Sequence, residues 1–73
     1  MSNNRDKFVE LAEKRVNRAI NDLRLIGNLS NKTNYRYDNE DVKKIFSSLE
    51  AEVKVARKRF ESIGSSQNPP FRL

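Results

Sequence analysis

Three groups of side chains in this 73-residue sequence could bind phosphates or stack on nucleic-acid bases. Guanidinium and ammonium groups pair with phosphate, and aromatic rings stack on unpaired bases. The basic members of the groups are Lys14, Arg15 and Arg18; Lys32 and Arg36; and Lys54, Arg57, Lys58 and Arg59. Tyr35 and Tyr37 flank Arg36, so an extended chain would point both rings to one side and the arginine to the other. This alternation suits single-stranded nucleic acid.

The same residues also have purely structural explanations. The net charge is +5, but acidic residues precede bases by four positions, a spacing that stabilises a helix without any ligand. These pairs are Glu10 with Lys14, Glu40 with Lys44, and Glu50 with Lys54. The last basic group also lies toward the end of a helical segment, where the helix dipole favours cations. Tyr35 could cap the end of a helix bundle, so each group has two interpretations.

Several classes of function are disfavoured by composition. The sequence contains no His and no Cys, so the commonest catalytic bases, nucleophiles and zinc ligands are missing. It has two Gly, too few for a glycine-rich phosphate loop. We therefore expect no enzymatic activity, no metal and no cofactor. No stretch approaches the roughly 18 apolar residues of a membrane span, and no signal peptide is evident, so we expect a cytoplasmic protein without a membrane partner.

Apolar residues recur at alternating intervals of three and four in two segments, which predicts two helices with one apolar seam each. The seam of the first helix, residues 5–26, is Val9, Ala12, Val16, Ala19, Leu23 and Ile26. The seam of the second helix, residues 38–63, is Val42, Phe46, Leu49, Val53, Ala56, Phe60 and Ile63. The predicted class is all-α, with a disordered N-terminus at 1–4, a loop at 27–37 and a flexible C-terminal tail at 64–73.

The residues between the helices predict how each helix ends or begins. Gly27 suits a left-handed residue that terminates the first helix. Asp38 suits the N-cap of the second, with Tyr37 and Val42 placed to pack on each other across the cap. The connection is longer than is usual in a bundle, so we expect it to have structure or a task of its own. Its asparagines are typical of turns.

The two seams are expected to pair as an antiparallel, coiled-coil-like hairpin. Six further apolar residues lie outside the seams: Phe8, Leu11, Ile20, Leu25, Ile45 and Val55. A hairpin alone would expose many of them, and so short a chain without a disulfide or metal has few other ways to bury apolar surface. We therefore expect a homodimer that forms a four-helix bundle with these six residues at the dimer interface.

Two functions remain for such a protein. The first is a small dimeric accessory protein that binds nucleic acid, preferably RNA or another non-duplex form, through its basic helix residues and its loop. The second is a protein-binding adaptor or inhibitor, of the kind that mobile elements and small bacterial operons encode, whose contacts are Leu29, Tyr35 and Tyr37. A third interpretation, a subunit of a larger assembly, predicts aggregation of the isolated chain. The positive net charge slightly favours the first.

Overall fold

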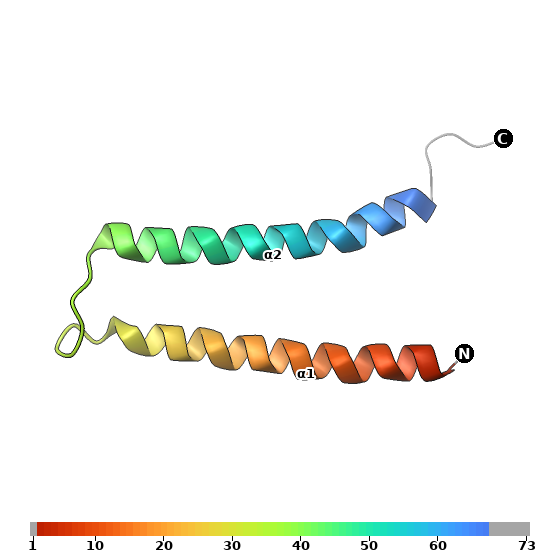
Figure 1. Cartoon of the computed structure of the whole chain (residues 1–73), viewed down its shortest axis with the longest axis horizontal. Helices are drawn as coiled ribbons and strands as arrows, with labels where there is room; N and C mark the ends of the chain where they lie inside the picture. The colour runs from red at the N-terminus through yellow and green to blue at the C-terminus, as the bar shows by residue number, and fades with distance from the viewer. Residues whose placement is uncertain (1, 68–73) are drawn as a thin grey trace. The chain divides into compact units, whose positions relative to one another are not determined.

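The chain forms two long helices joined by a short helical turn and an irregular segment (Figure 1). The computed structural model describes residues 2–67, with side chains described over residues 4–62. Helix α1 is Ser2–Gly27, the 3-10 helix η1 is Asn28–Ser30, and helix α2 is Asn39–Gln67. No strand occurs within residues 2–67. The predicted all-α class with two helices is confirmed.

Both helices extend beyond their predicted bounds. Residues 2–4, expected to be disordered, belong to α1, and residues 64–67, expected to belong to the tail, belong to α2. Adding a residue to an existing helix fixes one residue for one hydrogen bond, whereas nucleation fixes several, so short polar extensions propagate easily. The rest of the predicted tail, residues 68–73, lies outside the described part of the chain.

Helix α1 ends without the left-handed residue that the sequence predicted. Gly27 has φ −59° and ψ −30°, which is ordinary right-handed helical geometry, and no residue of the described chain has a positive φ. The chain instead tightens into η1, whose i to i+3 bonding uses carbonyls at the helix end without a left-handed turn. The prediction for Gly27 is therefore wrong in conformation, although the helix does end there.

Helix α2 begins with two reciprocal hydrogen bonds. The Asp41 amide donates to Asp38 Oδ1 at 2.9 Å, and the Asp38 amide donates to Asp41 Oδ2 at 3.0 Å. This is a capping box in which an aspartate stands where glutamate is usual. Glu40 and Asp41 add negative charge to the first turn, which the helix dipole favours. Tyr37 and Val42 are both partly buried, and the predicted cap at Asp38 is confirmed.

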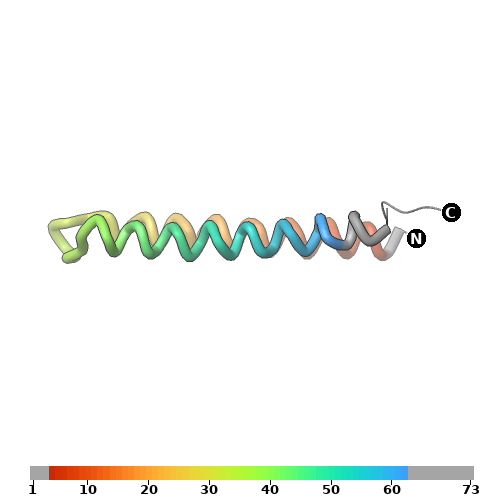
Figure 2. Tube along the Cα trace, turned by 90° about the horizontal axis from the view of Figure 1, so that it is seen from above, coloured from red at the N-terminus to blue at the C-terminus, as the bar shows by residue number. Residues whose placement is uncertain are grey.

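Each helix keeps an apolar side along its length. An α-helix turns about 100° per residue, so spacings of three and four return to the same side. Both helices follow a regular path (Figure 2). Among the described side chains none is buried, and the seam residues Val53 and Phe60 are 58% and 69% exposed. The chain therefore carries two amphipathic helices without a fully buried core residue in its described part.

Replacing Gly27 with alanine should stabilise the protein. A Cβ atom at Gly27 would meet nothing within 4 Å, and alanine loses less backbone freedom on folding than glycine. We expect the free energy of unfolding to rise by about 0.5 kcal/mol, measured by denaturant titration at one protein concentration. Gly27→Asn, which favours left-handed geometry, serves as the control and should gain less. A loss of stability in Gly27→Ala would contradict the right-handed conformation.

Removing the cap of α2 should destabilise it. Asp38→Ala deletes the carboxylate that accepts from the Asp41 amide, at a cost of about 1 kcal/mol in thermal or denaturant unfolding. Asp38→Asn keeps a side-chain oxygen at the cap and should stay close to the parent. Equal stability of the alanine and asparagine variants would show that the cap contributes nothing.

Candidate nucleic-acid interface

Helix α1 gathers four basic side chains on one side. Three exposed bases lie within about 100° of the helix circumference: Lys14, Arg15 and Arg18. Lys7 lies on the same side because it precedes Lys14 by about two turns. We call these four residues the basic face of α1. The face lies away from the middle of the apolar seam, so the two surfaces can be used at the same time.

The acidic residues of α1 are mostly elsewhere on the helix. Asp6 and Glu13 project toward the other side, Glu10 lies beside Lys14 at the edge of the basic face, and Asp22 lies on the side of the basic face but near its C-terminal end. Lys7 was not among the predicted contacts. The signal that could have found it is the spacing of seven residues to Lys14, which groups residues by helix side where a search for sequence clusters does not.

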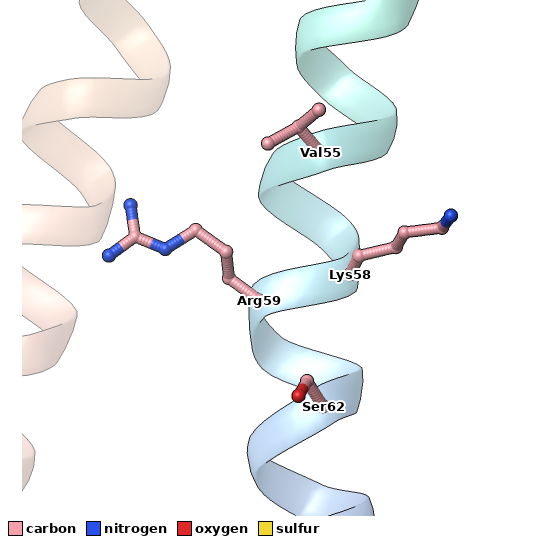
Figure 3. Close-up of a pocket in the computed structure, with 4 residues that line it drawn as sticks. All are labelled: Val55, Lys58, Arg59 and Ser62. Carbon is pink, nitrogen blue, oxygen red and sulfur yellow. The ribbon is translucent and has the colours of Figure 1, made fainter.

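The three consecutive basic residues near the end of α2 do not share a face, and the lysines of α2 that do lie on one side, Lys43, Lys44, Lys54 and Lys58, are mixed there with Glu40, Glu50 and Glu61. Arg57, Lys58 and Arg59 are consecutive, so each points about 100° away from the one before it. Figure 3 shows Lys58 and Arg59 extending to different sides of the helix. Glu50 and Glu61 lie on the side of α2 that carries Arg57. The densest basic cluster in the sequence is therefore dispersed in space.

An open depression lies on the surface of α2 near these bases. It is lined by Val55, Lys58, Arg59 and Ser62, all from the same helix (Figure 3). Each lining side chain is exposed. Small-molecule sites are usually concave and enclose most of their ligand, so this open surface between neighbouring side chains gives no such site.

Two of the acid and base pairs expected along the helices do not form ion pairs in the described side chains. Within residues 4–62, no nitrogen-to-oxygen distance of 4.0 Å or less joins Glu10 to Lys14 or Glu50 to Lys54. Exposed pairs of this kind contribute little in any case, because water screens them. Lys14 is exposed on the basic face of α1.

The segment between the helices has structure of its own, as predicted. The Asn31 carbonyl oxygen accepts from the amides of Asn34 and Tyr35 at 3.1 and 3.0 Å. Asn31 Oδ1 also accepts from the Thr33 amide at 3.0 Å, a turn that asparagine is suited to make. We call these three hydrogen bonds the Asn31 turn.

The predicted contact residues in and around the Asn31 turn differ in how exposed they are. Leu29 and Tyr35 are 47% and 48% exposed, whereas Tyr37 is partly buried beside the start of α2. Lys32 and Arg36 are exposed on the same segment. Leu29 and Tyr35 are therefore the accessible apolar residues among the three predicted contacts.

The six apolar residues predicted at a dimer interface do not all lie on the seam side of their own helix. Helix geometry places Phe8, Ile20 and Ile45 at the borders of the apolar seams. The other three lie on sides of the helices that face away from the seams: Leu11, Leu25 and Val55. All six except Leu11 are exposed. The first three fit an interface that extends the seams, and the last three do not.

Other site types find no support in the described residues. No group of three or more His, Cys, Asp or Glu side chains there could hold a metal ion, and neither described helix is long and apolar enough to cross a membrane. Comparisons with protein-family models, with curated proteins and with solved structures find no match for this chain. Function must be argued from its own surfaces.

Proposed function

We propose that the protein binds nucleic acid, RNA or another non-duplex form, with the basic face of α1 as its main contact. The observation that supports this is the collection of four exposed bases on one side of that helix, with Asp22 at the end of the face. A basic surface raises the local concentration of a phosphate backbone and neutralises its charge. The bases of α2, which are mixed with acidic residues, and the loop residues Lys32 and Arg36 would contribute a weaker, secondary field.

The composition of the face favours unpaired nucleic acid over a duplex. Lys7 and Arg18 are eleven residues apart, about 16 Å along the helix axis, which is enough to follow several phosphates. Leu11 and Leu25 project on the same side as the bases. Apolar side chains there could contact exposed nucleobases, which a duplex stacks away from the protein.

We further propose that α1 and α2 pair through their seams as an antiparallel hairpin, and that two copies join in a four-helix bundle. The exposure of Val53 and Phe60 supports this, because apolar stripes along two long helices would otherwise remain in water. Most of the basic face lies opposite the seam, so association would leave Lys7, Lys14 and Arg18 at the surface of the bundle.

Binding is tested by the salt dependence of affinity. We expect labelled single-stranded RNA to bind with an affinity that falls steeply between two salt concentrations, measured by fluorescence anisotropy. The triple variant carries Lys7→Gln, Lys14→Gln and Arg18→Gln. Each neutralised phosphate on a single strand contributes about 0.7 to the slope of log affinity against log salt. We therefore expect the slope to flatten by about 2 for each copy of the basic face that contacts the RNA. Arg15 is kept, since it borders the apolar seam.

The matched control removes the same charge from α2. The variant Lys44→Gln, Lys54→Gln and Lys58→Gln changes the net charge equally, away from both the seams and the basic face of α1. It should lose clearly less affinity, with helicity by circular dichroism unchanged in both variants. Equal losses would contradict a localised contact on α1, and an absence of binding at low salt would end the proposal.

A second candidate function rests on the Asn31 turn. This turn holds Leu29 and Tyr35 on an ordered segment while leaving each about half exposed. An ordered aromatic residue contributes strongly to protein interfaces because little freedom is lost when it binds. The loop therefore suits the contact surface of an adaptor or inhibitor.

Capture of a protein partner from nuclease-treated cell extract tests this candidate. Tyr35→Ala should reduce capture at least about tenfold, the size of an interface anchor, without changing helicity. Tyr35→Phe keeps the ring and should retain most of the capture. If the alanine variant captures the same partner equally well, the loop serves as a connector only.

A further inference from the structure

The residues that border the two apolar seams carry complementary charges. Along one border, α1 presents Glu13 and Ile20, and α2 presents Glu50 and Arg57. Along the other border, α1 presents Phe8, Arg15 and Asp22, and α2 presents Ile45, Glu52 and Arg59. Residues in these positions set partner choice and orientation when helices pack along a seam.

Antiparallel pairing of α1 with α2 brings opposite charges together along both borders of the seam. If Val16 meets Val53, then Glu13 comes level with Arg57 to within about 2 Å along the axis, and Arg15 comes level with Glu52 to within about 3 Å. Opposite charges thus meet on both sides of the seam.

The border that carries Arg15 also brings an aromatic ring level with a cation. In the same register Phe8 comes level with Arg59 to within about 3 Å. Its ring already attracts a guanidinium, since Arg5 Cζ lies 5.9 Å from the ring centroid. The pairing places no two like charges opposite each other at these border positions.

Pairing of α2 with a copy of itself is less favourable. In a bundle whose two loops lie at opposite ends, each α2 would run antiparallel beside the other copy's α2. Glu52 borders the α2 seam about halfway along its length. In that bundle it would therefore come level with Glu52 of the second copy. Like charges at an interface suppress that arrangement.

The apolar side of α1 is also wide enough for two neighbours. From Phe8 to Ile20 it covers about 120° of the circumference, wider than the narrow seam of a two-stranded coil. Phe8, Ile20 and, on α2, Ile45 are exposed at its borders. A second helix against α1 would cover one border and a third would cover the other.

We propose that two copies of the chain join so that each α1 lies between two antiparallel α2 helices, one from its own chain and one from the second copy. The two loops then lie at the same end of the bundle. One border of α1 is covered by α2 of the same chain, and α2 of the second copy covers the other. The contact between copies is then stabilised by one of the two charge pairs, either Glu13 with Arg57 or Arg15 with Glu52. This inference rests on the antiparallel pairing proposed above and is independent of nucleic-acid binding.

Charge reversal tests the two pairs. At low salt, each of the single variants Glu13→Arg, Arg57→Glu, Arg15→Glu and Glu52→Arg should lower the thermal midpoint at fixed protein concentration. Each double reversal, Glu13→Arg with Arg57→Glu or Arg15→Glu with Glu52→Arg, should restore most of the loss, because the pair is rebuilt with its signs exchanged. Midpoints that stay low in both double variants would overturn the pairing.

Mixing of single variants then separates contacts within a chain from contacts between copies. When an Arg15→Glu chain meets a Glu52→Arg chain, a pair between copies becomes opposite in sign at both of its occurrences, whereas a pair within each chain stays repulsive. The same holds for Glu13→Arg mixed with Arg57→Glu. We expect mixing to lower the dimer dissociation constant by about tenfold for one of the two pairs, measured by sedimentation velocity without nucleic acid.

The two mixtures together decide the arrangement. Rescue in one mixture and not in the other supports an α1 helix between its own α2 and that of the second copy. Rescue in neither mixture excludes charge pairing between copies, and rescue in both would mean that each α1 contacts α2 helices of the second copy only. Either of these results overturns the proposal, whatever the outcome of the RNA titration.

Discussion

About a third of the circumference of each helix is apolar, and water contact with that surface opposes the folded state. Isolated helices are marginal in water because nucleation is costly, so helices of globular proteins depend on the packing of an apolar face. Neither disulfides nor a histidine–cysteine metal site can assist, because the chain contains no Cys or His. The seam therefore limits where a ligand can bind, because a ligand surface can use only the sides of the helices that lie outside the seam.

Helix α1 meets this constraint by dividing its circumference among three kinds of side chain. The seam occupies one side. Beyond one border of it lie the acidic residues Asp6, Glu10 and Glu13 together with Arg24, and along and beyond the other border lie Lys7, Lys14, Arg15 and Arg18 together with Asp22. A helix with mixed charges on every side would have little local field despite a positive sum. Separation of the signs gives α1 a direction in which a polyanion is attracted.

The elements of the fold that could be predicted from sequence are those decided by local chemistry. The seams follow from spacing, and the Asp38 cap follows from one side chain next to free amides. The end of α1 could not be predicted in the same way, because Gly27 permits a left-handed turn without requiring it and the chain takes η1 instead. For a related reason, clusters in the sequence do not show which bases share a side. Arg57, Lys58 and Arg59 are adjacent in sequence, yet a helix points adjacent residues apart, while Lys7 joins Lys14 from two turns away.

The Asn31 turn would also decide whether two copies that pair as proposed can exchange helices. Chains of this type can exchange helices when the connection straightens and joins both helices into one long rod, a form of domain swapping. Straightening here would break the bonds from Thr33, Asn34 and Tyr35 to Asn31, and also the Asp38 to Asp41 capping box. In the proposed dimer, the hydrogen bonds of the joint would therefore resist chain exchange and favour closed pairs over open-ended polymers of the same sequence.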